Sequence, residues 1–188
     1  MKIDKKLNLV LEIERDDNSV VAIHHTPISS EIYKSHFRFI SKVLFGLYMD
    51  GMTPAQCTRL VHDAMLESIR DNGDRFKDVE KTLLNEIWRL TNVVVPGERG
   101  WETVPFYEAM KGEWLSSGDV DEVKNYVCFF TSASWVHGRR ELPGMYEMVA
   151  QSGVLTTSLD STEYARSLPT STLAANTGAT ETPSSIPV

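Results

Sequence analysis

The apolar residues of the chain change their period near Pro27, and this change sets what the chain can fold into. Residues 6–15 alternate, with Leu9 and Leu11 on one side, which is typical of a half-buried strand. A second apolar, β-branched run at residues 20–26 follows a short polar turn, so we expect the two runs to pair as a hairpin. Because a lone hairpin is only marginally stable, it has to pack on helices or on another subunit.

Beyond Pro27 the apolar residues recur at helical spacing. The pattern predicts helices from residue 29 or 30 to about 49, from 53 to about 70, from about 75 to 91, from 106 to 115 and from about 120 to 137, with further helical segments at 143–151 and 161–167. The segment 120–137 is the most apolar, so we expect it to be central. Residues 93–105 hold two prolines and two glycines, which predicts a structured loop.

The end of the chain differs in composition from the rest. Residues 168–188 carry a single charge, on Glu181, and no aromatic side chain. Such a segment buries too little apolar surface to offset the roughly 1 to 2 kcal/mol per residue that ordering the backbone costs. We therefore predict one mainly helical domain over residues 1–167 and a flexible Ser/Thr/Pro-rich tail over 168–188. The fold class is α+β, mainly α: an N-terminal β-hairpin packed on a bundle of five or six helices, with a disordered C-terminal tail.

Charge and composition exclude several classes of function. The formal net charge of −7 opposes binding to nucleic acid, whose phosphates require a basic face. No apolar run reaches the roughly 18 residues of a membrane span, and the N-terminus lacks the pattern of a signal peptide. Cys57 and Cys128 lie in half-apolar, helical segments, so we expect buried free thiols in a reducing cytoplasm.

The residue types that carry chemistry do not form a recognisable catalytic or ligand-binding pattern. The five histidines include no pair at the spacing of a helical zinc site, and neither cysteine has a CxxC partner. No serine lies in a nucleophile elbow, and the glycines near Pro96 lack the order of a phosphate-binding loop. The carboxylates at 108, 113, 119 and 121 are interpreted as a solvated face. We expect no catalytic residue, no cofactor and no metal.

Large aromatic side chains are the candidates for partner binding, because they are enriched both in cores and at the centres of interfaces. Trp88 and Trp135 lie in apolar helical segments and are assigned to the core. Trp101 lies in a glycine-bounded loop, and its sequence context is equally consistent with a contact to a partner and with packing inside the protein. The residues at which we predict partner contacts are Phe37, Phe39, Tyr48 and Trp101.

Several segments in a fixed order resemble one family. They are KIDKKLNLVLEIE near the start, HTPIS at 25–29, LTNVVVPGERGWETVPFYEAM at 90–110, VCFFTSASWVHGRRELPGM at 127–145 and SLPTST at 167–172. Together they resemble the tail assembly chaperones of long-tailed, siphovirus-like bacteriophages, over nearly the whole chain up to the tail. The resemblance lies in the order and spacing of these segments, and none of them is a mechanistic signature on its own.

The resemblance implies a non-enzymatic protein of the host cytoplasm that binds the phage tape-measure protein, keeps it soluble, recruits tail-tube subunits and is absent from the mature virion. Family members are often made in a second, longer form by a translational frameshift near the end of the gene. Frameshift sites commonly encode lysine, and the last lysine here is Lys124, so this chain departs from that pattern. The family has no catalytic residues to transfer.

Two other readings stay open at the level of sequence. The chain could be a structural virion component, such as a tail-completion or neck protein, whose hairpin and tail are ordered by neighbours in a ring. It could also be an enzyme or an inhibitor of host machinery, which would require a deep pocket with perturbed titratable groups. An exposed hairpin edge also favours self-association into a homo-oligomer.

Overall fold

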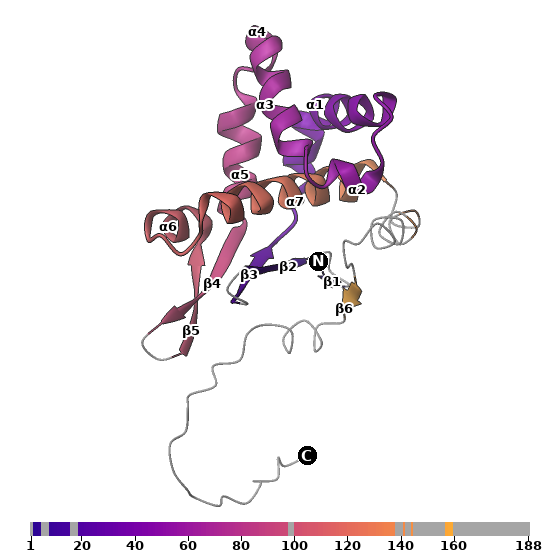
Figure 1. The fold of residues 1–188 in the computed structure, drawn as a ribbon. Helices are drawn as coiled ribbons and strands as arrows, with labels where there is room; N and C mark the ends of the chain where they lie inside the picture. Colours follow the sequence, from indigo (N-terminus) through magenta and orange to yellow (C-terminus); the bar gives the residue numbers. More distant parts are fainter. Residues whose placement is uncertain are drawn as a thin grey trace, which may run out of the picture.

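The computed structural model describes residues 2–4, 8–15, 19–97, 100–137, 141, 144 and 157–159. It has the predicted α+β class: one sheet and a larger set of helices, with helix as the main element (Figure 1). The helices predicted at 143–151 and 161–167 and the tail predicted at 168–188 lie outside the described residues.

The sheet is formed by segments that are far apart in the sequence. Its strands are β1 (Lys2–Asp4), β2 (Leu9–Glu14), β3 (Val20–His25), β4 (Thr91–Gly97), β5 (Gly100–Pro105) and β6 (Thr157–Leu159), in the order β5-β4-β3-β2-β1-β6. The pairs from β5 to β1 are antiparallel, and β6 pairs with β1 in parallel.

The N-terminal hairpin predicted from the alternating pattern is confirmed. Strands β2 and β3 pair from Leu9 opposite His25 to Glu14 opposite Val20. The alternating side chains of Leu9, Leu11 and Ile13 all enter the main core, as a period of two requires when one face of a sheet packs on helices. These side chains therefore attach the hairpin to the helical layer.

The prediction of a loop at 93–105 is wrong, because the described residues of this segment lie in the paired strands β4 and β5. The apolar run at Val93 and Val94 pairs with Ile23 and Ala22 of β3, and this tertiary pairing decides the conformation. Both prolines are compatible with strands here, since Pro96 lies near the end of β4 and Pro105 ends the edge strand β5, positions at which a missing N–H is tolerated.

The helices agree with the prediction in part. They are α1 (Ser30–Met49), α2 (Pro54–Cys57), α3 (Val61–Asp71), α4 (Gly73–Phe76), the π-helix η1 (Glu80–Leu84), α5 (Asn85–Arg89), α6 (Phe106–Lys111) and α7 (Ser117–Val136). The helices predicted at 29–49 and 120–137 are confirmed as α1 and α7. The segment predicted as one helix at 53–70 is interrupted between α2 and α3, and the one predicted at 75–91 contains the π turn and ends before β4.

Helix α7 is the centre of the molecule. Figure 1 shows it running between the sheet on one side and α1, α2, α3 and α4 on the other. It contacts β2, α1, α3 and α5, and twelve of its residues are buried. The predicted central position of this helix is confirmed. Helix α1 packs against α2, α3, η1 and α7 in the outer layer, with four of its residues buried.

Candidate protein-interaction surface

Helix α1 carries three of the four residues predicted to contact a partner, and they face different surroundings. The side chain of Phe37 is 45% exposed, whereas that of Phe39 is 2% exposed and packs edge-on against Phe76. The expected exposure of Phe39 is therefore wrong. Two residues along a helix point about 200° apart, so Phe37 and Phe39 could not both have faced the same partner.

Tyr48 is half-buried and joins the end of α1 to the end of α7. Its ring lies 6.3 Å from that of Phe45 and 6.2 Å from that of His137, and its hydroxyl is 3.4 Å from His137 Nε2. Burial, and then the neighbouring Cys57, raise the pKa of Tyr48 to about 12. The phenol therefore stays protonated at neutral pH, with its ring against Phe45 and its hydroxyl close to His137.

Trp101 lies on the edge strand β5 and is 38% exposed. Figure 1 places β5 at the opposite end of the molecule from α1. The four predicted residues therefore do not form one surface: Phe37 and Tyr48 lie on α1, Trp101 lies on the far hairpin, and Phe39 lies in the core.

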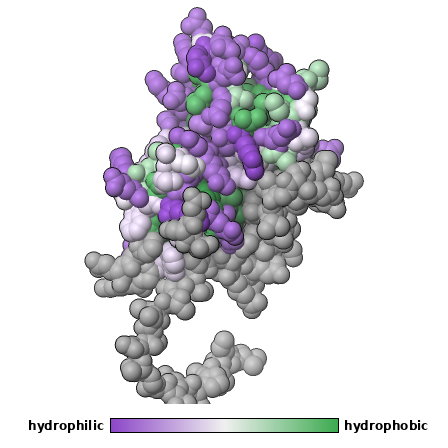
Figure 2. Space-filling view, viewed as in Figure 1, coloured by the Kyte–Doolittle hydropathy of each residue, from purple (hydrophilic) through white to green (hydrophobic). Residues whose placement is uncertain are grey.

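The structure instead brings together an apolar row along the outer side of α1. Phe37, Phe45 and Met49 are 45%, 50% and 86% exposed. They are four or eight residues apart, so they lie on successive turns of the helix along a row that winds gradually around its axis. Figure 2 shows apolar side chains gathered on the surface where α1 and α2 lie, with hydrophilic ones around them. The sequence analysis missed Phe45 and Met49, although a count of residues four apart would have found them.

A row of basic side chains runs beside the apolar row. Lys34, Arg38 and Lys42 repeat every four residues along α1. The Arg38 guanidinium lies 5.8 Å from the centre of the Phe37 ring, close enough for a cation–π contact. Lys42 Nζ donates a hydrogen bond of 3.0 Å to Asn72 Oδ1 and so bridges α1 to the end of α3.

Arg75 of α4 extends the basic row beyond α1. The Arg75 guanidinium and Lys42 Nζ lie 5.3 and 5.5 Å from the centre of the same Phe76 ring. Arg38 and Arg75 also line one hollow of about 300 Å³, whose wall includes a single carboxylate, that of Asp78. We call the surface formed by Lys34, Phe37, Arg38, Lys42, Phe45, Met49 and Arg75 the α1 face.

Carboxylates lie near one part of the α1 face, since Lys42 shares a hollow with Asp50, Glu67 and Asp71, but the cations of this face form no ion pair with the described part of the chain. Within it, none of Lys34, Arg38, Lys42 and Arg75 forms an ion pair. Glu31 is the one acidic residue of the α1 sequence, whereas the whole chain has a net charge of −7. The α1 face is thus a basic and partly apolar region on an acidic protein.

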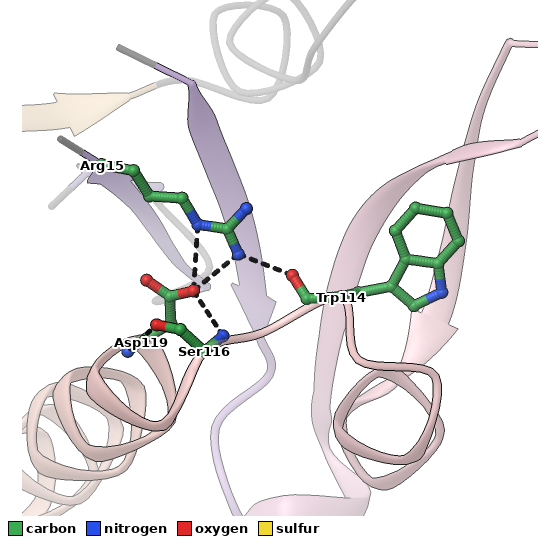
Figure 3. A network of polar contacts seen from close by, with 4 residues as sticks. All are labelled: Arg15, Trp114, Ser116 and Asp119. Carbon is green, nitrogen blue, oxygen red and sulfur yellow. Dashed lines mark hydrogen bonds and ion pairs between the residues drawn. The ribbon is translucent and has the colours of Figure 1, made fainter. Parts of the chain in front are cut away.

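A second polar region, at the start of α7, shows the opposite arrangement (Figure 3). Arg15, at the end of β2, donates from Nε and Nη2 to Asp119 Oδ2 at 3.0 and 2.6 Å, and from Nη2 to the carbonyl of Trp114 at 2.6 Å. Ser116 and Asp119 form a capping box, in which each backbone N–H donates to the other's side chain. Here the arginine and the buried carboxylate are paired with each other.

Asp119 is 5% exposed, so its interpretation as part of a solvated face is wrong. Burial alone would raise the pKa of Asp119, but the hydrogen bonds from Arg15 and Ser116 and the charge of Arg15 together hold it below its usual value. The carboxylates at 108, 113 and 121 are exposed as expected. The Ser-x-x-Asp spacing at 116–119 was the signal for this cap.

Two hollows flank the first turns of α7. One, of about 740 Å³, is lined by Arg15, Asp119 and Glu122, and the other, of about 380 Å³, by Arg59, Asp63 and Glu122. Burial, and then Asp119, raise the pKa of Glu122. Since Arg15 is already paired with Asp119, this region serves to fix the start of α7 on the sheet.

The buried reactive groups are held in inert forms. Cys57 and Cys128 are free and buried, as predicted. Burial raises the pKa of Cys57 to about 11 and raises that of Cys128 further, so both thiols stay protonated and weakly nucleophilic. Among the described residues, His, Cys, Asp and Glu side chains nowhere gather in a group of three or more that could hold a metal ion.

His25 is fully buried between the sheet and α7. Its Nδ1 lies 3.0 Å from Thr91 Oγ1, and its Nε2 lies 3.2 Å from Thr131 Oγ1. Because Thr91 donates its own proton to the carbonyl of Ile87 at 2.8 Å, Nδ1 must carry the hydrogen and Nε2 must accept from Thr131. Burial, and then His24, lower the pKa of His25 to about 3.

Comparisons of the chain with protein-family models, with curated proteins and with solved structures found no match. In the part of the chain that the structure describes, no helix combines the length and the apolar character needed to cross a membrane.

Proposed function

We propose that this protein is a tail assembly chaperone of a long-tailed bacteriophage. It binds the tape-measure protein in the host cytoplasm, keeps it soluble, recruits tail-tube subunits and is released before the virion is complete. The resemblance of the ordered sequence segments supports this function. The structural observation that carries it is the apolar row of the α1 face, Phe37, Phe45 and Met49, which is exposed on an otherwise charged helical surface.

A long helical protein with an apolar side aggregates unless that side is covered, and a helix with exposed apolar residues can cover it. Fully burying one large apolar side chain contributes about 1.5 to 3 kcal/mol. Three side chains that start about half or more exposed therefore provide a reversible contact, which suits a chaperone that must later release its client.

Co-expression with the tape-measure protein of the same phage tests the proposal. We expect the tape-measure protein to become soluble and to elute with this protein in size-exclusion chromatography. The double variant Phe45→Ser/Met49→Ser should lose both effects. The control Leu66→Ser/Tyr107→Ser removes two large exposed side chains elsewhere, which are 38% and 45% exposed, and should keep both effects. A tape-measure protein that stays insoluble with the unaltered chain contradicts the function.

The edge strand β5 favours a second candidate function, a structural virion component. The outer edge of β5 pairs with no described strand, and Trp101 on it is 38% exposed. Such an edge can pair with a neighbouring subunit in a ring. Mass spectrometry of purified virions separates the two candidates, because stoichiometric presence in the particle supports the component and excludes the chaperone.

A further inference from the structure

We infer that the α1 face binds a partner helix whose apolar stripe is bordered by aspartate and glutamate side chains. This inference rests on the proposed function in taking the partner to be a helical protein. It goes further in assigning the contact to one face of one helix and in specifying the charge of the partner.

The apolar row indicates which shape of partner fits the α1 face. Side chains four apart on a helix form ridges that fit the grooves of a second helix. Phe37, Phe45 and Met49 lie on one such ridge, and Ser41 occupies the remaining position, so a small gap separates two apolar contacts. A helix with an apolar stripe can lie along this ridge, whereas an extended strand would find no free backbone groups to pair with, because those of α1 are bonded within the helix.

The basic row indicates which charge a partner of the α1 face should carry. Lys34, Arg38, Lys42 and Arg75 form no ion pair with a described residue, and they border the apolar row on one side. Unpaired cations beside exposed apolar side chains are complementary to carboxylates beside an apolar stripe. A partner with lysines in those positions would place like charges together.

The same cations argue for a protein partner over nucleic acid. A phosphate backbone would engage the basic row but leave Phe45 and Met49 uncovered, and the net charge of −7 would repel the rest of the polyanion. A second copy of this chain would have to bring an acidic helix with its own exposed apolar stripe. The row beside the apolar one on α1 is itself basic, so two α1 faces would bring like charges together and repel each other.

The inference is tested on the full-length protein with two synthetic helical peptides. Each has about 20 residues, which is roughly the length of α1. Both carry the same leucine stripe, flanked by glutamate in one and by lysine in the other. Affinities are measured by fluorescence anisotropy at low and high salt. The net charge of −7 by itself favours the lysine peptide, so a preference for the glutamate peptide has to come from a local basic surface.

We expect the glutamate peptide to bind at least tenfold more tightly at low salt and to lose most of that advantage at high salt. The variant Arg38→Glu/Lys42→Glu should reverse the preference. The control Lys81→Glu/Lys111→Glu makes the same change in net charge at exposed sites on η1 and α6 and should keep it. Circular dichroism serves as the folding control, and both variants should keep the helical signal of the unaltered protein.

Other outcomes overturn the inference. Equal affinity for the two peptides removes the charge argument, and loss of binding in both variants alike removes the assignment to α1. Tighter binding of a DNA duplex than of the glutamate peptide shows a nucleic-acid surface instead, and a concentration-dependent dimer that Phe45→Ser abolishes shows a second copy as the occupant. If the peptides behave as expected while co-expression leaves the tape-measure protein insoluble, the inference about the α1 face is supported and the tape-measure function is refuted. If co-expression succeeds while the peptides do not behave as expected, only the inference about the α1 face is refuted.

Discussion

Helices α1 and α7 have the same length and opposite surroundings. Each has 20 residues, and each begins after a serine that caps it. Helix α7 buries twelve of its residues, and α1 buries four, which are Phe39, Ile40, Val43 and Leu44. The sequence of α7 is apolar or small all round from Val127 to Ala133, which is typical of a helix enclosed by other elements.

The difference separates the part of the molecule that holds the fold from the part that is free to bind. Several polar groups on α7 are buried and partnered, as in the contacts of Thr131 with His25 and of Asp119 with Arg15, although Ser132 Oγ is buried without a hydrogen-bond partner in the described part of the chain. Cations on α1 have no carboxylate partner among the described residues. Substitutions on α7 should therefore change stability, and substitutions on the outer side of α1 should change binding.

The sharpest test replaces one phenylalanine on each helix. Phe130→Ala on α7 removes a fully buried ring that packs edge-on at 5.9 Å from His25. It should lower the free energy of unfolding by about 3 to 5 kcal/mol. Phe37→Ala on α1, where the ring is 45% exposed, should change it by no more than about 0.5 kcal/mol. Urea denaturation measures both, and similar losses for the two variants would contradict the division.

The second test uses the pH dependence of stability. The pKa of His25 is about 3 in the folded protein and about 6.5 in the unfolded chain. A lowered folded pKa means that the unfolded state takes up the proton first, so stability is complete above pH 6.5 and falls as the pH drops toward 3. Between pH 7 and pH 5 the loss from this residue should be about 2 kcal/mol.

His25→Gln should remove that part of the slope in urea denaturation at pH 7, 6 and 5. His62, whose pKa is lowered by burial and then by Lys124, remains in both proteins and cancels in the comparison. If the variant is too unstable to fold, the nitrogen chemical shifts of His25 in the unaltered protein give the same information: a ring still neutral at pH 5, with its hydrogen on Nδ1, agrees with the network, and a protonated ring contradicts it.

The third test compares the N-terminal caps of the two helices. Asp119→Ala removes half of the capping box of α7 and leaves Arg15 without its carboxylate, so it should lower the free energy of unfolding by about 2 kcal/mol. Ser29→Ala removes a single hydrogen bond of 3.3 Å, from Ile32 N–H on α1, and should cost about 0.5 to 1 kcal/mol. Thermal unfolding at pH 7 ranks the two. An equal or larger cost at Ser29 would show that α1 depends more on its own end than on packing.

The sequence predicted both long helices well, because each has local signals at its ends. Ser29 and Ser116 are followed by apolar residues at helical spacing, and the observed α1 and α7 begin directly after these serines. The β4–β5 hairpin was missed because its glycines and prolines resemble a loop locally. What makes it a hairpin is the pairing of Val93 with Ile23 across the sheet, which no local pattern contains.

The binding surface was predicted less completely than the fold. Phe37 was found from its residue type, but exposure depends on which side of α1 faces α7, and a helical period fixes that side only once the core is known. Phe39 was misplaced for this reason. The basic row was not predicted, although Lys34, Arg38 and Lys42 recur every four residues in the sequence. The addition of Arg75 depends on the contact of α4 with α1 around Phe76.

The smallest expected effect concerns the charges at the two ends of α1. Asp50 caps the C-terminus, and Glu31 lies in the first turn. A carboxylate is unfavourable at the negative end of the helix dipole and favourable at the positive end. Asp50→Asn should therefore stabilise the protein by about 0.3 kcal/mol and Glu31→Gln should destabilise it by a similar amount, although both remove one negative charge from an acidic chain. Urea denaturation at low salt should give opposite signs, and high salt should shrink both. A change of the same sign in both variants would mean that the net charge of the molecule, rather than the dipole of α1, determines how these two carboxylates affect stability.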